Sequence, residues 1–210
     1  MEISERKINF LRKKIIGWGK NNYEYFPWRN TDNHWHALAA EIMLQRTKAD
    51  QVVPVFLDFS EKYKTPSEFL NDKSKNIFEN LGLHWREDKL TDLAKALEGK
   101  PIPSEKKELI ALPAIGEYIS AAYRSFHLNL FDVIIDSNIV RVYGRFFGFE
   151  TNNESRRKKE FKFLAVKCTP LRNQRSYNYG ILDFSRKICK SDPNCVKCPI
   201  AKKCTLFSNP

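Results

Sequence analysis

Apolar side chains along this chain recur mostly at the three- and four-residue spacing of an amphipathic helix, and strand-like alternation is scarce. In the first such segment, residues 8–19, one face carries Ile8, Leu11, Ile15, Ile16 and Trp18. The same spacing predicts helices at residues 36–45, 49–63, 86–98, 104–111, 117–126, 136–146, 156–166 and 176–189. A short helix is expected after Pro66, with Ser67 as its cap. Residues 133–135 fit either a buried strand or a turn of helix, so the pattern predicts an almost all-α protein.

The composition supports a folded protein with a sizeable core. Of 210 residues, 42% are hydrophobic and 13% are aromatic, which excludes a disordered chain. The sequence has no run of about 18 apolar residues, so no membrane span is expected. Residues 1–7 lack the apolar stretch of a secretory signal. We therefore expect a cytoplasmic, nucleoid-associated protein.

The charge balance is strongly basic and indicates a polyanionic partner. Lys and Arg number 36 against 25 Asp and Glu, giving a net charge of +11. Neutralising phosphates releases counterions and drives association with nucleic acid. A charge that serves only solubility is the alternative.

Four of the five cysteines gather near the C-terminus. Cys189, Cys195, Cys198 and Cys204 are separated by five, two and five residues. Such sets hold either tetrahedral zinc or a [4Fe–4S] cluster, and this single compact loop favours the cluster over two zinc knuckles. Cys168 stands outside the set and is expected to be an inert packed residue.

Two carboxylates occupy unusual places. Glu41 lies among seven apolar residues of a predicted helix, where burial would raise its pKa and suit it to acid or base catalysis. The alternative is a buried structural Glu held by an arginine. Asp136 follows an apolar run and precedes a predicted helix, so it is either an N-cap or a reactive carboxylate, and the two roles are compatible.

A short turn, Leu-Pro-Ala-Ile-Gly at residues 112–116, joins two predicted helices. Backbone N–H groups at such a turn and at the following helix start can bind a DNA phosphate without reading sequence. An ordinary connection between helices is the alternative.

Taken together, these motifs resemble the helix-hairpin-helix base-excision glycosylases of the endonuclease III superfamily. The matching stretches include Ala-Glu-Ile-Met-Leu-Gln-Arg-Thr around Glu41, the 112–116 turn, Ile-Ile-Asp-Ser-Asn-Ile-Val-Arg-Val around Asp136 and the four cysteines. The likeness spans residues 26–204 and points to the mismatch branch, which comprises thymine-DNA mismatch glycosylases and MutY-type adenine glycosylases. It implies two helical lobes: a bundle at 26–130 that contains the hairpin, and a second lobe from 1–25 and 131–210 with the cluster loop at 185–205.

The resemblance also implies roles for individual residues. Asp136 would be the catalytic aspartate and Glu41 the second carboxylate. Bifunctional members carry a lysine two residues after Gly116, where this chain has Tyr118, so the enzyme should leave an abasic site without cutting the strand. Two departures are a missing glycine at Ala114 and a first cysteine loop, residues 190–194, that is one residue short.

Mismatched double-stranded DNA is the expected partner of what we take to be a monomer, with the target base flipped out of the helix. The residues expected to contact DNA are Trp28, Arg29, Gln45, Arg46, His84, Trp85, Leu112, Ala114 and Gly116. Phosphate contacts are also expected from Lys187, Lys190, Lys197, Lys202 and Lys203.

The chain ends at Pro210, without the C-terminal domain that is usual in adenine glycosylases. We therefore predict removal of thymine or uracil opposite guanine. The alternatives are an adenine glycosylase acting opposite guanine or oxidised guanine, and a non-catalytic DNA-binding protein of the same fold.

Overall fold

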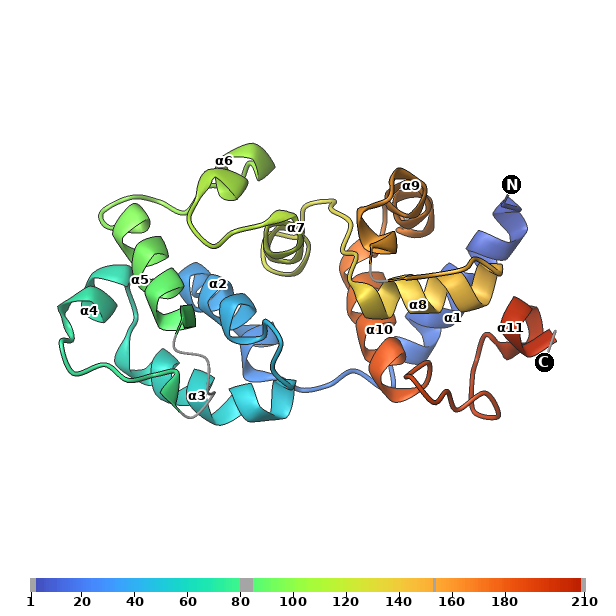
Figure 1. Ribbon diagram of the computed structural model, residues 1–210, viewed down its shortest axis with the longest axis horizontal. Coiled ribbons are helices and arrows are strands. Elements are labelled where there is room, and N and C mark those ends of the chain that lie inside the picture. Colours follow the sequence, from blue (N-terminus) through green and yellow to red (C-terminus); the bar gives the residue numbers. More distant parts are fainter. Residues whose placement is uncertain (1–2, 80–84, 153, 209–210) are drawn as a thin grey trace. The chain divides into compact units, whose positions relative to one another are not determined.

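The computed structural model describes residues 3–79, 85–152 and 154–208, and within these ranges its regular elements are all helices (Figure 1). The chain divides into two compact units. Residues 25–130 form one, here called the inserted unit, and residues 1–24 with 131–210 form the other, here called the terminal unit. No helix of the described chain is long and apolar enough to cross a membrane.

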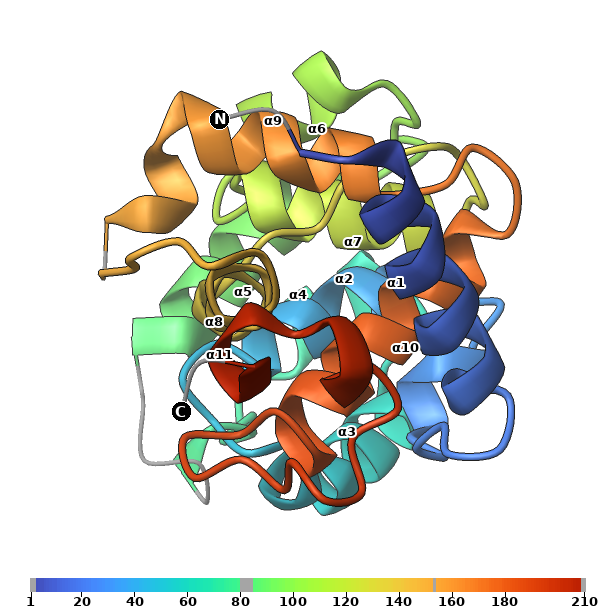
Figure 2. The ribbon, with the colours of Figure 1, turned by 90° about the vertical axis from the view of Figure 1, so that its right-hand side faces the viewer.

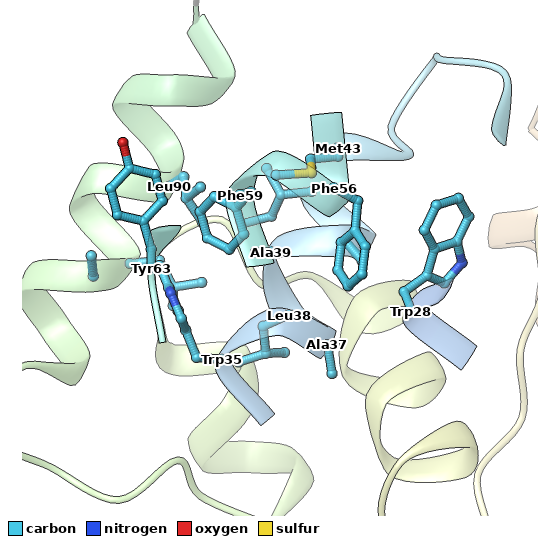
Figure 3. Packing of buried hydrophobic residues seen from close by; sticks show 14 of the residues in the cluster. Trp28, Trp35, Ala37, Leu38, Ala39, Met43, Phe56, Phe59, Tyr63 and Leu90 are labelled. Atoms are coloured by element: carbon cyan, nitrogen blue, oxygen red, sulfur yellow. The ribbon is translucent and has the colours of Figure 1, made fainter. Parts of the chain in front are cut away.

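The inserted unit is built around a helix that is buried on all sides. Its elements are η1 (Pro27–Asn30), α2 (His34–Met43), α3 (Ala49–Lys62), α4 (Pro66–Asn71), α5 (Trp85–Leu97), α6 (Lys106–Ala111) and α7 (Glu117–Phe126). Every α2 residue after His34 is buried, and its neighbours are η1, α3, α5 and α7. Small side chains such as Ala37 and Ala39 let large rings from α3, including Phe56 and Phe59, pack closely (Figure 3).

Capping residues set where two of these helices begin. Asn33 accepts hydrogen bonds from the N–H groups of Trp35 and His36, so α2 starts two residues earlier than its apolar spacing predicts. The expectation that Ser67 caps the next short helix is wrong. Thr65 is the cap and accepts from the Glu68 N–H at 3.2 Å, because Pro66 takes the first helical position, where its missing N–H costs nothing.

The terminal unit joins the two ends of the chain. It contains α1 (Glu5–Gly19), α8 (Ser137–Phe147), η3 (Ser155–Arg157), α9 (Lys159–Cys168), α10 (Gln174–Lys187), η4 (Ala201–Lys203) and α11 (Thr205–Ser208). Figure 2 shows α1 beside α10, which also packs against α8. Gly180 favours this close approach, because a Cβ there would make a tight contact of 3.0 Å with the Ile15 carbonyl oxygen.

Residues 133–135 form neither the strand nor the helical turn considered above. Side chains of α10 replace a partner strand: the Asp132 N–H donates to Gln174 Oε1 at 3.0 Å, and Asn178 Nδ2 donates to the Asp132 carbonyl at 3.2 Å. These contacts satisfy buried backbone groups and fix the approach to α8.

Candidate functional site

Asp136 caps α8 and is held by two donors. Its Oδ1 accepts from the Ile139 N–H at 2.7 Å, and its Oδ2 accepts from Asn138 Nδ2 at 3.0 Å. The side chain is half-buried at the positive end of the helix dipole. The N-cap expected from the sequence is therefore present, and it fixes a carboxylate in one orientation.

A chain of hydrogen bonds runs from Asp136 to the first cysteine. Arg141 Nη1 donates to Asn138 Oδ1 at 2.9 Å, and its Nε donates to the Cys189 carbonyl at 3.0 Å. Its Nη2 donates to the Ser185 carbonyl at 3.0 Å. Burial lowers the pKa of Arg141, while Cys189 and Asp136 act in the opposite direction. Sequence reasoning missed this arginine because its partners are mostly distant backbone carbonyls.

The four cysteines line one pocket of the terminal unit. Cys189, Cys195, Cys198 and Cys204 share it with apolar neighbours such as Phe146 and Ile200. Within the described ranges no three His, Cys, Asp or Glu side chains are grouped so as to hold a metal ion. Burial raises the pKa of the Cys189 thiol and raises that of Cys198 to about 11.

Arg145 anchors the loop that follows Cys189. Its Nη1 lies 3.7 Å from Cys189 Sγ and donates to the Lys190 carbonyl at 2.6 Å, and its Nη2 donates to the Ser191 carbonyl at 2.9 Å. Cys204 Sγ in turn donates to the Arg145 carbonyl at 3.4 Å. Four thiols on one pocket beside a guanidinium match the donor set and charge of an anionic iron–sulfur group. Cys168 is buried outside this pocket, and burial raises its pKa to about 12.

Glu41 lies in the inserted unit, on the central helix α2. Its side chain is 7% exposed among buried residues of the unit, as its apolar surroundings predict. Asp136 belongs to the terminal unit, so the two carboxylates come from different parts of the chain.

The turn at residues 112–116 connects α6 to α7, and one of its residues, Ala114, has an unusual backbone conformation. Ala114 adopts a left-handed φ of 65°, which a Cβ disfavours. Gly116 has an ordinary φ of −97°, and a Cβ placed on it would meet nothing within 4 Å. Leu112 and Tyr118 pack against the core of the inserted unit. The fold itself therefore does not require glycine at 116, although close approach of a ligand to the backbone would.

A second turn follows α2 and carries Gln45 and Arg46. Arg46 is exposed and takes a left-handed φ of 58°. Arg86 of α5 is fully buried. Its Nη1 donates both to the Met43 carbonyl at 3.0 Å and to Thr47 Oγ1 at 2.7 Å. No sequence signal singled out Arg86, because its partners lie about 40 residues away.

The remaining residues expected at DNA divide by exposure. Trp28 and Arg29 are buried. The Trp28 ring stacks on the Phe26 ring with 4.8 Å between centroids, and the Arg29 guanidinium lies 5.3 Å from the centroid of the Phe26 ring. Their contact with DNA stays a prediction. Trp85 is 37% exposed, with Lys89 Nζ 4.5 Å from its ring. His84 lies outside the described residues.

The lysines around the cysteine loop are exposed at Lys190, Lys197, Lys202 and Lys203. Lys187 is also exposed but engaged: its Nζ lies 2.7 Å from Glu24 Oε1 and donates to the Asn22 carbonyl at 3.0 Å. All five lysines predicted to contact phosphates are therefore exposed, and only Lys187 of the five forms a salt bridge within the described residues.

The chain matches known proteins over nearly its whole length. A thymine-DNA glycosylase of Aeropyrum pernix is 30% identical over 99% of this chain and 98% of its own length. A thymine/uracil-DNA glycosylase of Methanothermobacter thermautotrophicus is 31% identical, covering 97% and 95%. An adenine DNA glycosylase of Buchnera aphidicola is also 31% identical, but the match spans 93% of this chain and only 58% of that protein.

Comparison of structures agrees. The solved structure of a thermostable thymine-DNA glycosylase superposes with a TM-score of 0.90 at 29% identity, covering 98% of each chain. No family model matches the sequence. The full-length similarity nevertheless decides the family: the chain belongs to the helix-hairpin-helix superfamily of DNA glycosylases, in its mismatch branch.

Proposed function

We propose that this protein is a monofunctional base-excision glycosylase that removes thymine or uracil opposite guanine and leaves an abasic site. The observation that carries the proposal is the Asp136 carboxylate, which two donors fix at the start of α8. Departure of the base develops positive charge on the deoxyribose, and a fixed carboxylate stabilises that charge.

Glu41 and Tyr118 are assigned to the remaining parts of the reaction. Water adds to C1′ of the sugar as the C1′–N bond breaks, and the base leaves with the bonding electron pair and a proton. Glu41, buried on α2, is assigned to moving that proton or orienting the water. Tyr118 offers no amine for a Schiff base, so the proposed route is direct hydrolysis.

The choice of base rests on likeness and on the cost of flipping. Two thymine-acting relatives are 30% and 31% identical to this chain, and the solved thymine-DNA glycosylase superposes with a TM-score of 0.90. A G·T or G·U pair is held more weakly than a matched pair, so its pyrimidine costs less to extrude. An adenine opposite guanine or oxidised guanine is the alternative substrate.

The four cysteines would hold a [4Fe–4S] cluster. When bound, the cluster would tie residues 189–204 into one structural loop. Arg145 and Arg141 orient the Cys189 segment from the α8 side through their bonds to backbone carbonyls. Lys190, Lys197, Lys202 and Lys203 would then face the phosphates of double-stranded DNA, which the protein would bind as a monomer at the chromosome.

One panel of duplexes tests the function. Duplexes with a central G·T, G·U, G·A or oxidised G·A pair are incubated with the protein and then heated in alkali, which cuts at abasic sites. We expect cleavage of the thymine and uracil strands only after alkali, and no covalent adduct when borohydride is added. Cleavage confined to the adenine strand would replace the proposed substrate, and absence of cleavage in all four would refute the activity.

A further inference from the structure

Arg86 is an unusual residue for a protein core. Its side chain is fully buried at the second position of α5, in the inserted unit. Two of its three guanidinium nitrogens, Nε and Nη2, have no hydrogen-bond partner among the described residues. Its bonds go to one backbone carbonyl and one threonine, and no carboxylate of the described chain pairs with it.

The single engaged nitrogen bridges both ends of the turn after α2. Met43 is the last residue of α2, and its carbonyl has no partner within the helix. Thr47 stands just before α3, beyond Arg46. By contacting both, Arg86 Nη1 closes residues 44–46 into a fixed turn. Arg46 lies inside this turn in a left-handed conformation, which is strained for a residue with a Cβ.

Charge makes a purely structural role costly. Burial lowers the pKa of Arg86, and the neighbouring Arg46 lowers it further, so two cations are gathered at one turn. A buried ion without an opposite charge destabilises a fold, and an apolar residue of similar volume is often the more stable choice. Because an apolar residue would often give a more stable fold, the buried arginine points to a role of this turn in function.

We propose that Arg86 is a positioning residue that fixes the turn carrying Gln45 and Arg46, and thereby sets how strongly the enzyme prefers a mismatched to a matched duplex. This inference rests on the proposed function and on the contact with DNA that the sequence predicts for Gln45 and Arg46. Arg86 acts through the turn and does not itself touch the substrate.

The test alters the bridge at its other end. Thr47→Val removes the acceptor at nearly constant shape, and Thr47→Ser retains it as the matched control. For each variant, affinity is measured for a duplex with 2′-fluorothymidine opposite guanine, which resists excision, and for the same duplex with a G·C pair. Thermal unfolding is recorded in parallel, and Arg86→Lys serves as a second variant that keeps the charge without the planar fork.

We expect Thr47→Val to lose about tenfold in preference for the mismatch, the effect of one hydrogen bond to a charged donor, with Thr47→Ser near the wild-type preference. Arg86→Lys should lose preference similarly. An unchanged preference in Thr47→Val, or an equal loss in Thr47→Ser, overturns the inference. Wild-type excision of ordinary thymidine from the same duplex tests the proposed function separately, so the two failures are distinguishable.

Discussion

Arg141 donates from Nε to the carbonyl oxygen of Cys189 at 3.0 Å, across 48 residues of sequence. The same side chain bonds Asn138, whose amide bonds Asp136. The carboxylate assigned to catalysis and the first cysteine of the C-terminal loop are thus supported by one guanidinium. A displacement of the C-terminal loop would therefore be transmitted through Arg141 and Asn138 to the Asp136 carboxylate at the start of α8.

Arg141→Met should therefore weaken the terminal unit at both ends of this chain of bonds. Loss of charged hydrogen bonds to the Cys189 and Ser185 carbonyls should lower the free energy of unfolding by about 2–3 kcal/mol. Iron content per chain should fall as well. Denaturant unfolding and iron analysis measure the two effects. Arg156→Met, at an exposed arginine of the same unit, is the control and should change neither.

Asp136→Asn separates capping from catalysis. Asparagine is as good an N-cap as aspartate, so stability should hold while the loss of charge slows excision by a factor of about 10² or more. Asp136→Ala should additionally cost about 1 kcal/mol of stability. Single-turnover kinetics and thermal unfolding check both. A rate for Asp136→Asn within twofold or so of wild type would show that another group carries the charge.

Ala114→Gly should stabilise the protein. The left-handed φ of 65° strains an alanine but not a glycine, and the relief exceeds the extra entropy of an unfolded glycine. We expect a gain of about 0.5–1 kcal/mol. Ala111→Gly, at the exposed end of α6, should instead lose about that amount, because helical geometry favours alanine. If both variants changed the free energy of unfolding in the same direction, the strain inferred at Ala114 would be contradicted.

Gly116→Ala tests the phosphate contact at the hairpin. The added Cβ meets nothing within 4 Å in the chain and φ is −97°, so the fold should be as stable as before. A phosphate close to this backbone would be displaced, and affinity should fall about equally for mismatched and matched duplexes. Unchanged affinity in a salt titration would place the phosphate elsewhere.

Acid should weaken the inserted unit through His36. Burial lowers the pKa of His36 below its usual 6.5, and its Nε2 lies 2.8 Å from the Tyr63 carbonyl. The unfolded chain therefore binds protons more readily, so this contribution to stability is complete above about pH 6.5 and is lost as pH falls. His36→Gln should flatten the stability profile between about pH 5 and 7.

Local signals predicted the helices and the Asp136 cap well, because both depend on neighbours in sequence. The helix at Glu117–Phe126 was predicted to the residue. Prediction was poorer where partners are distant. The backbone N–H and C=O of Asp132, ahead of α8, are bonded by the side chains of Gln174 and Asn178 instead of a strand, and no local pattern shows this.

The residues of the candidate site likewise divide into those that the sequence reveals and those that it does not. Glu41 and the 112–116 turn stand out because a residue type contrasts with its surroundings. Arg86 and Arg141 look like ordinary helical arginines, since their backbone partners could be any residue type. Arginines that bind backbone carbonyl groups are therefore the part of the candidate site that only a structure reveals.

The packing of α1 against α10 also has a consequence for synthesis on the ribosome. Ile8, Leu11 and Ile15 emerge first, but their partner helix begins at Gln174. At about 5–20 residues per second, the ribosome needs on the order of 10–30 seconds to supply it. The inserted unit can complete its core in that interval. The helix α1 is thus made long before it can find its place, and chaperones have their best opportunity to bind its apolar face before then.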